Sequence, residues 1–353
     1  MALQMYVSLQ GDNRIVRFLM DPETGSLEPN GAVEIDGGPA PLTFNPDRTV
    51  MYVGRRDGLL LSSFAIDQNN GDLTHTGSVE LGGEPCYLST DHTGRYVLSA
   101  YYQAGYCAVH PIDAAGAVGG AATEWLETGS GAHCFMTDPS NLYAFLPHIA
   151  NGSGGIARLP VDRQEAVNAI YQYRFDAATG RLTANDPLEV PQGEEVGPRH
   201  YRFHPSKDLM YVSNEQDGSV TVYALDTAKG TLSPVQTIST LPDGYTEKKL
   251  CSQIQMHPAG AHLYVGNRGH NTIASFAIDS ATGTLTASGW TEVDQVPRAF
   301  SLDPTGNFLY VTGLDTGNII GFRVDQRSGA LTRLETHAVG SLPMWVLITE
   351  LAG

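Results

Sequence analysis

Short apolar runs recur along the chain and alternate with turns that are rich in proline, aspartate and glycine. In each repeat, an apolar run leads through a turn into a run of the Tyr-Val type. A polar turn, an alternating run that ends in Phe or Tyr, and a TG-x-Leu-Thr hairpin follow. Alternation with a period of two predicts β-strands, because successive side chains of a strand point to opposite faces. Long amphipathic helical patterns are nearly absent.

The repeat has a period of roughly 50 residues with about four strands per unit, which is typical of propeller blades. Six complete units begin at Pro41, Pro85, Ala132, Pro198, Cys251 and Pro297.

The two chain ends supply the seventh unit. The tail PMWVLIT, which starts at Pro343, resembles only the first strand of a unit, and the head that starts at Met5 resembles only the second to fourth strands. Joining them closes the array and protects its edges. The sequence therefore predicts an all-β, seven-bladed β-propeller, a single domain over residues 1–353, with the closing blade shared between the C-terminal strand and the N-terminal strands.

Two units carry extra residues. The third has IANGSGGIARLPVDRQEAVN, an insertion around 150–170, between its second and third strands. The fourth has LPDGYTEKK before the next blade. Long insertions in a compact domain are often functional loops, and the alternative is a tolerated surface excursion.

The antiparallel order places two positions of every unit at the same mouth of the propeller, because the first strand leaves one face and the second returns to it. The residues that open the first strands are Ala40, Cys86, His133, Arg199, Ser252, Arg298 and Met344. The residues just past the second strands are Arg56, Tyr102, Glu215, Arg268, Leu314 and Gln10, with Pro147 beside His148 in the third unit.

Four arginines, one carboxylate and one or two histidines at this mouth predict a cationic funnel. Arginine binds carboxylate and phosphate through its planar fork, so the expected ligand is a small anion. The chain as a whole has 38 acidic against 21 basic residues and a net charge of −17, which argues against nucleic acid or an anionic membrane as partner. Alternatively, each arginine pairs with a local acid and only connects blades.

His133 and Glu215 are the predicted proton carriers, with His148 in reserve. An imidazole beside guanidinium groups is disfavoured in its charged form, so His133 is expected to be a neutral base, and the carboxylate is expected to stay ionised. Among the other histidines, His270 lies beyond Arg268 and is expected near the mouth.

Three histidines have other expected roles. His204 and His257 precede turn prolines and are predicted to be structural, and His200 alternates away from Arg199. No HExxH, GxSxG, P-loop or dinucleotide fingerprint appears, and no metal or cofactor is expected.

The remaining composition favours a folded protein of a reducing compartment. Hydrophobic residues make up 41% of the chain, which supports a sizeable core. Four cysteines form no CxxC pair, and neither a signal peptide nor a membrane span is visible. We therefore expect a cytoplasmic protein whose oligomeric state the sequence leaves open.

Four motifs carry a family resemblance: GAHCFMTDP at 131–139, GPRHYRFHP at 197–205, YVSNE at 211–215 and YVGNRGHNTIASF at 264–276. They resemble the seven-bladed propeller lactonase family, which includes bacterial propeller-type 6-phosphogluconolactonases and fungal carboxymuconate lactonizing enzymes. PMWVLI at 343–348 and VPRAFSLDPTGNFLYV at 296–311 are similar to the bacterial branch. The resemblance covers nearly the whole chain.

By this resemblance, the active site consists of His133, Arg199, Glu215 and Arg268. Two features depart from the family pattern: the insertion after Ile149, which would overhang the mouth, and Leu314, where many members carry Asn or Gln. Both bear on the choice of substrate and leave the four residues intact.

The resulting hypothesis is a lactonase that hydrolyses a small anionic sugar lactone, with 6-phosphogluconolactone as the first candidate. His133, assisted by Glu215, takes a proton from the attacking water. Arg199 and Arg268 act in catalysis, and the predicted substrate-binding residues are Arg298, Arg56, Tyr102, His148 and His270. Two alternatives remain: a carboxymuconate-type cycloisomerase that uses the same arginines, and a non-catalytic propeller that binds a partner.

Overall fold

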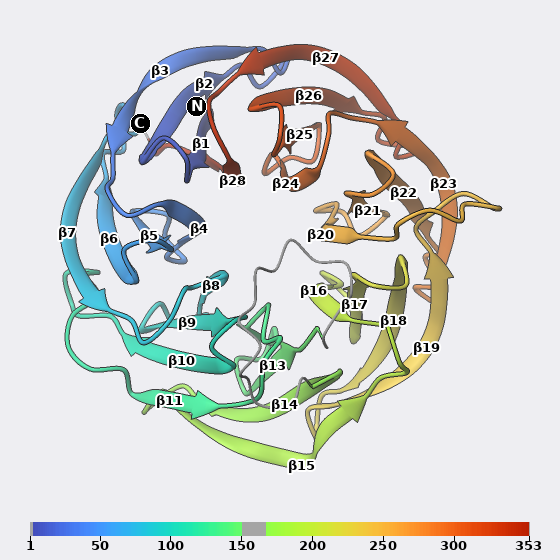
Figure 1. The fold of residues 1–353 in the computed structure, drawn as a ribbon, viewed down its shortest axis with the longest axis horizontal. Helices are drawn as coiled ribbons and strands as arrows, with labels where there is room; N and C mark the ends of the chain where they lie inside the picture. Colours follow the sequence, from blue (N-terminus) through green and yellow to red (C-terminus); the bar gives the residue numbers. More distant parts are fainter. Residues whose placement is uncertain (1–2, 150–166, 353) are drawn as a thin grey trace. The chain divides into compact units, whose positions relative to one another are not determined.

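The computed structural model describes residues 3–149 and 167–352, and every regular element in this part of the chain is a β-strand. The strands form four-stranded antiparallel sheets, seven in the described residues, so the fold is the seven-bladed β-propeller that the repeat predicts (Figure 1). The chain divides into two compact units. The expectation of a single domain over 1–353 stays a prediction.

The first unit comprises Met1–Ile35, His200–Ala224 and Ser233–Gly353. It holds three whole sheets and most of a fourth, in the strand orders β28(Pro343–Glu350)-β1(Leu3–Leu9)-β2(Arg14–Met20)-β3(Leu27–Glu34), β24(Pro297–Leu302)-β25(Phe308–Gly313)-β26(Asn318–Val324)-β27(Leu331–Ala338), β20(Cys251–Met256)-β21(His262–Asn267)-β22(Thr272–Ile278)-β23(Leu285–Glu292) and β16(Pro198–Phe203)-β17(Leu209–Asn214)-β18(Ser219–Asp226)-β19(Thr231–Ser239).

The second unit comprises Asp36–Arg199 and Leu225–Leu232. Its three sheets have the orders β4(Pro39–Phe44)-β5(Val50–Arg55)-β6(Leu60–Ile66)-β7(Leu73–Glu80), β8(Tyr87–Thr90)-β9(Tyr96–Tyr101)-β10(Tyr106–Pro111)-β11(Glu124–Glu127) and β12(Met136–Thr137)-β13(Tyr143–Pro147)-β14(Ala169–Asp176)-β15(Arg181–Pro191). The first predicted insertion falls between β13 and β14, and its residues 150–166 lie outside the described residues.

The closing blade is formed as predicted, by the two ends of the chain. β1 pairs antiparallel with β28, with Leu3 opposite Glu350 and Val7 opposite Val346, and Figure 1 shows the blue N-terminal strand beside the red C-terminal one. Both strands contribute buried apolar side chains to one cluster, including Met5, Val7 and Ile348. Hydrogen bonds and a shared core therefore hold both ends of the chain in the first unit.

A tyrosine in the second strand of a blade bonds to the hairpin of a neighbouring blade. In the first unit, the hydroxyls of Tyr211, Tyr264 and Tyr310 donate to the carbonyls of Gly283, Gly329 and Gly25 at 2.7, 3.0 and 2.6 Å. In the second unit, Tyr52 donates to Gly116 at 2.9 Å. These glycines belong to the hairpins between the third and fourth strands and adopt φ values of 72° to 82°, a region that glycine occupies without strain.

In the complete blades, the turn between the first and second strands is capped by a side chain that accepts backbone N–H groups. In the first unit, Asp303 Oδ1 accepts from Phe308 N at 2.7 Å, and the Nδ1 atoms of His204 and His257 each accept a backbone N–H at 3.1 Å. Because Nδ1 accepts, the ring proton lies on Nε2, which faces the carbonyl of Gly260 in one case and of Gly306 in the other. The predicted structural role of these two histidines is confirmed.

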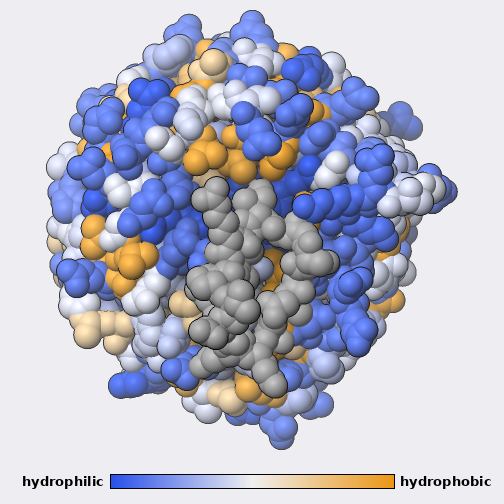
Figure 2. All heavy atoms as spheres, viewed as in Figure 1, coloured by the Kyte–Doolittle hydropathy of each residue, from blue (hydrophilic) through white to orange (hydrophobic). Residues whose placement is uncertain are grey.

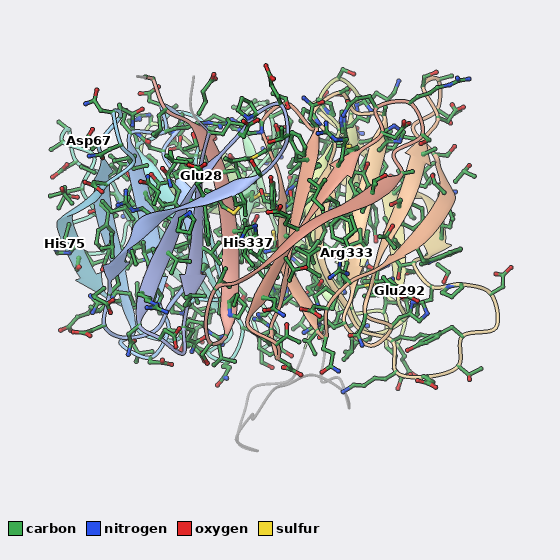
Figure 3. All side chains as sticks on the ribbon, turned by 90° about the horizontal axis from the view of Figure 1, so that it is seen from above. Glu28, Asp67, His75, Glu292, Arg333 and His337 are labelled. Carbon is green, nitrogen blue, oxygen red and sulfur yellow. The ribbon has the colours of Figure 1, made fainter. Side chains whose placement is uncertain are left out.

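The outermost strands are half exposed and polar. In β27, Arg333 is exposed and His337 partly so, and Figure 3 labels both residues together with Glu28 of β3 and Glu292 of β23. Figure 2 shows that hydrophilic residues cover most of the face in view. This distribution agrees with the acidic composition of the chain, which has 38 acidic against 21 basic residues.

We expect Gly230→Ala to lower the free energy of unfolding by about 3 kcal/mol, because a Cβ would fall on the Tyr143 ring while φ is 68°. Gly244→Ala is the matched control: its φ is 78°, but a Cβ there meets nothing within 4 Å, so only the backbone cost of about 1 kcal/mol remains. Urea unfolding of both variants checks this. Equal losses would contradict the steric argument.

Stability should fall as the pH decreases below about 6.5, the ordinary pKa of histidine. Burial lowers the pKa of His204 and of His257, so below that pH the unfolded chain binds more protons than the folded one and unfolding is favoured. In a His204→Asn/His257→Asn variant the melting temperature should drop less between about pH 7 and about pH 5. Asn45 caps the corresponding turn of the second unit. Identical drops would exclude these two histidines as the cause.

Candidate functional site

Strand register places the two predicted mouth positions of a blade at the same end of its sheet. In the first unit, Cys251 lies opposite Asn267, so Ser252 and Arg268 are neighbours at that end. In the second unit, Ala132 bridges His148, and His133 N donates to Pro147 O at 3.0 Å. The antiparallel argument therefore holds within these sheets.

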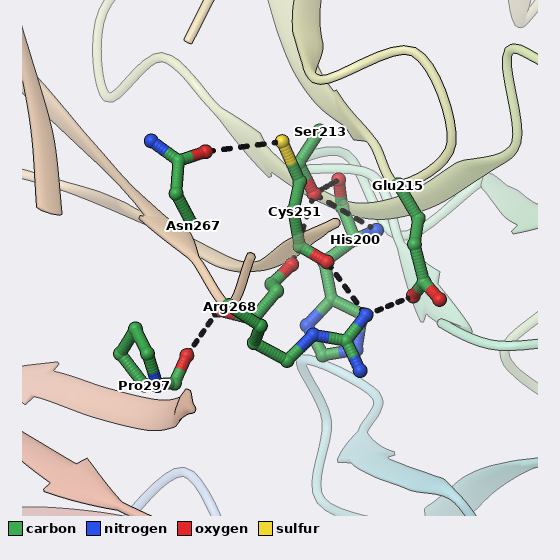
Figure 4. Close-up of polar contacts among 8 residues, drawn as sticks. His200, Ser213, Glu215, Cys251, Asn267, Arg268 and Pro297 are labelled. Carbon is green, nitrogen blue, oxygen red and sulfur yellow. Dashed lines mark hydrogen bonds and ion pairs between the residues drawn. The ribbon is translucent and has the colours of Figure 1, made fainter. Parts of the chain in front are cut away.

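The first unit contains a buried ion pair between two of the predicted catalytic residues. Arg268 Nη2 lies 2.6 Å from Glu215 Oε2, and the side chains are 4% and 8% exposed (Figure 4). The same nitrogen donates to Cys251 O at 2.8 Å, and Cys251 N donates to Glu215 O at 3.1 Å. The backbone of Cys251 thus connects the acid with the arginine, and the pair has a fixed geometry.

Other predicted residues of the first unit have contacts of their own. Ser252 Oγ donates to Pro297 O at 2.6 Å, next to the half-buried Arg298. His270 Nδ1 lies 2.9 Å from Thr272 Oγ1, and its ring packs edge-on against Tyr245, 4.9 Å between centroids. Tyr245 belongs to the predicted LPDGYTEKK loop, so this loop contacts the turn that follows Arg268.

The blade that contains Arg298 also presents an apolar side chain, just past its second strand. Leu314 is 8% exposed and lines an open pocket together with Leu342, which is 42% exposed. His200 is buried, as its alternation away from Arg199 suggests, and its ring lies 6.2 Å from that of Trp345.

The second unit places His133 against an aromatic ring and a thiol. Its ring lies 5.6 Å from the Tyr102 ring in an edge-on arrangement, and the side chain is nearly buried. Cys86 Sγ lies 3.4 Å from the carbonyl oxygens of Ala132 and of His133. The strand start that carries His133 is therefore tied to the blade that carries Tyr102.

The charges of two predicted arginines affect the pKa of the Cys86 thiol. Burial raises the pKa of Cys86 to about 11, and the positive charges of Arg56 and Arg199 oppose that shift. Both guanidinium groups therefore lie within electrostatic range of the Cys86 side chain, which itself contacts the His133 backbone. The second unit thus gathers His133, Arg199 and Arg56, three of the predicted site residues.

Arg56 has a carboxylate partner that the sequence analysis missed. Its Nη2 forms an ion pair with Glu84 Oε1, and both side chains are partly exposed. Glu84 directly precedes Pro85, where the second repeat begins, and this acid next to a mouth position was the signal available. Arg56 therefore pairs with a local acid, which is the alternative to anion binding that the sequence left open for the arginines.

His148, the reserve proton carrier, is fully buried. Its ring lies 4.5 Å from that of Tyr171, and burial lowers its pKa to about 3. The imidazole is therefore neutral at physiological pH and is poorly suited to hold a proton there.

The four cysteines lie in the described residues, are buried and form no disulfide. Residues 3–149 and 167–352 contain no group of three or more His, Cys, Asp or Glu side chains arranged to hold a metal ion. No helix in this described part of the chain has the length and hydropathy that a membrane crossing requires.

Comparisons with known proteins agree with this architecture. A family model described as "Lactonase, 7-bladed beta-propeller" matches residues 4–348. The chain is 33% identical over 327 residues to proteins named 6-phosphogluconolactonase from Pectobacterium atrosepticum and Pectobacterium carotovorum, covering 93% of each chain. Among solved structures, it resembles the periplasmic gluconolactonase PpgL of Pseudomonas aeruginosa, with a TM-score of 0.88, 26% identity and coverage of 99% and 100%.

Removing one member of the buried pair should destabilise the protein strongly. We expect Arg268→Met and Glu215→Gln each to lower the free energy of unfolding by about 3 kcal/mol, because the remaining polar partner stays buried without its counterion. The double variant should lose less than the sum, with a coupling energy of about 2 kcal/mol in urea unfolding.

The exposed pair Arg181–Glu124, at 3.1 Å with the arginine side chain 63% exposed, is the control. Arg181→Met should cost about 0.5 kcal/mol or less. If the losses of the Glu215→Gln and Arg268→Met variants simply add in the double variant, the interaction between the two side chains contributes nothing to stability.

Proposed function

The chain belongs to the lactonase family of seven-bladed β-propellers and is a lactone-hydrolysing enzyme, and we propose that its substrate is 6-phosphogluconolactone, which it converts to 6-phosphogluconate. The two Pectobacterium relatives carry the name of that activity, and a putative 6-phosphogluconolactonase from Bacteroides fragilis is a structural neighbour with a TM-score of 0.85 and 25% identity. The reaction needs one water molecule and no cofactor.

The observation that carries the proposal is the group around His133 in the second unit. The side chain lies against Tyr102, and Arg56 and Arg199 act on the Cys86 thiol that contacts the His133 backbone. Guanidinium groups hold phosphate and carboxylate oxygens by paired hydrogen bonds, and they disfavour a charged imidazole nearby. This environment places the proposed base near groups that can bind an anionic substrate.

The buried pair of the first unit supports the second half of the chemistry. An arginine and a carboxylate that lie 2.6 Å apart hold each other in a fixed orientation. We assign Arg199 and Arg268 to the developing oxyanion and the anionic group, and Glu215 to the orientation of the base or the water. Arg298, Arg56, Tyr102, His148 and His270 stay predicted substrate-binding residues.

The proposed reaction proceeds by water attack on the lactone carbonyl. His133 takes a proton from the water as the new C–O bond forms, and an arginine stabilises the oxyanion, an interaction of about 3 kcal/mol for one well-placed donor. The ring C–O bond then breaks, and His133 returns its proton to the ring oxygen. The product is the open-chain hydroxy acid.

We place this reaction in carbohydrate metabolism, as the lactone-opening step of the pentose phosphate pathway, and in the cytoplasm. Four buried cysteines that form no disulfide support a reducing compartment. Since PpgL is described as periplasmic, fractionation of the native host tests this assignment, and recovery in the periplasm would overturn it.

A hydrolysis panel tests the substrate. The purified chain should open 6-phosphogluconolactone with a kcat/KM well above that for unphosphorylated gluconolactone, after correction for spontaneous opening. Including 3-carboxymuconate separates hydrolysis from cyclisation. A preference for the unphosphorylated lactone would show that the proposed substrate is wrong and that the reaction is still lactone hydrolysis. Efficient turnover of 3-carboxymuconate would show that the enzyme is a cycloisomerase and that the proposed reaction is wrong.

His133→Ala should lower kcat by about 10²- to 10⁴-fold while KM changes little, because the histidine acts on the water and not on the anionic group. His75→Ala is the matched control, since His75 is an exposed histidine on the outer strand β7 (Figure 3). Steady-state kinetics of both variants decide the question. A His133→Ala enzyme that keeps kcat within a few-fold would show that another group is the base.

A further inference from the structure

The second strands of two blades end in an asparagine, and these are the blades that carry Glu215 and Arg268. Asn214 and Asn267 directly precede them, and both asparagines are buried, at 0% and 1% exposure. At the corresponding position, the other five sheets carry Leu9, Arg55, Tyr101, His148 and Gly313. The fold therefore does not require an amide here. Burying one costs free energy unless its hydrogen bonds are made.

Both ends of the Asn267 amide are bonded to one residue, Thr240. Asn267 Nδ2 donates to Thr240 O at 2.7 Å, and Thr240 Oγ1 donates to Asn267 Oδ1 at 2.8 Å. A further contact joins Nδ2 to Thr272 Oγ1 at 3.3 Å. These bonds fix the end of β21, from which Arg268 leaves the strand.

The same two side chains contact Cys251, whose backbone meets the ion pair. Cys251 Sγ lies 3.6 Å from Asn267 Oδ1 (Figure 4), and it lies 3.2 Å from Thr240 Oγ1. The Cys251 carbonyl accepts from Arg268, and its N–H donates to the Glu215 carbonyl. Thr240 and Asn267 thus hold the residue that bridges the acid and the arginine.

Thr240 also holds the turn that follows Glu215. Its backbone N–H and its hydroxyl both lie within hydrogen-bonding distance of Gly218 O, at 2.8 and 2.9 Å. Asn214 Nδ2 bonds at the base of this turn, to Ser219 Oγ at 2.8 Å and to Thr221 Oγ1 at 2.9 Å. One threonine therefore connects the turn after Glu215 with the strand end before Arg268.

We propose that Asn214, Thr240 and Asn267 are positioning residues that set the geometry of the Glu215–Arg268 pair for catalysis. The proposal rests on the proposed function of that pair. The three residues act through the pair and not on the substrate. A shift of the guanidinium by a fraction of an ångström weakens its interaction with the transition state more than its interaction with the substrate. Their loss should therefore appear in kcat.

The test compares isosteric and conservative changes at the central residue. Thr240→Val removes the hydroxyl at constant shape and should lower kcat by about tenfold with KM within about twofold, whereas Thr240→Ser keeps the hydroxyl and should retain kcat within about twofold. Asn267→Ser should lower kcat by at least as much as Thr240→Val. Titration with 6-phosphogluconate, the proposed product, corrects each preparation for its binding-competent fraction.

Asn185→Ser is the matched structural control. Asn185 is a buried asparagine whose Nδ2 bonds to the carbonyls of Lys229 and Gly230 in the second unit. This change should lower the melting temperature as Asn267→Ser does, and leave kcat per competent enzyme unchanged. If Asn267→Ser and Thr240→Val also leave kcat unchanged, the positioning role is wrong.

A crystal structure of the Thr240→Val variant gives a readout that does not depend on the substrate. The distances from Arg268 Nη2 to Glu215 and to Cys251 O should lengthen relative to the parent protein. Unchanged distances would overturn the proposal. If the parent protein opens another lactone and not 6-phosphogluconolactone, the proposed substrate is wrong, and the same variants are measured with that lactone.

Discussion

The hydrogen bond from a buried tyrosine to a glycine carbonyl in a neighbouring blade is the contact on which the arrangement of the sheets depends. Within the first unit it recurs three times with the same partners, from Tyr211, Tyr264 and Tyr310. Each bond needs two local conditions. The tyrosine must be buried away from water, and the hairpin glycine must have a positive φ and no Cβ, which leaves room for the side chain two positions before the tyrosine: Leu209, His262 or Phe308. Because these bonds fix neighbouring blades of the first unit to one another, they also fix the ends of the strands that carry Glu215 and Arg268.

Features that repeat within one blade could be predicted from the sequence, because their physical cause is local. The alternation of apolar residues predicted the strands, and the truncated repeats at the two ends predicted the pairing of β1 with β28. The histidines before Pro205 and Pro258 were predicted as structural for the same reason: a side chain that caps its own turn needs no knowledge of the rest of the fold.

Features that join blades escaped prediction, because they depend on residues far apart in the chain. The partner of Arg56 is Glu84, 28 positions later. The partner of Asn267 is Thr240, in the outer-strand region of a different repeat. Counting residues at the mouth suggested four arginines and one carboxylate, and did not include Glu84, which pairs with Arg56 in the second unit. The charge beside Arg56 is therefore less positive than the count indicated.

The closing blade has a consequence for synthesis of the protein. β28 follows every other described strand in chain order, while its partner β1 precedes them all. On the ribosome, the N-terminal strands emerge early and keep an unpaired edge until translation reaches the last one. A product that stops before Pro343 leaves that edge open to other chains and to proteases. The pairing of β1 with β28 thus makes protection of the earliest described strand depend on the latest one, because this edge of β1 stays unpaired until β28 has been made.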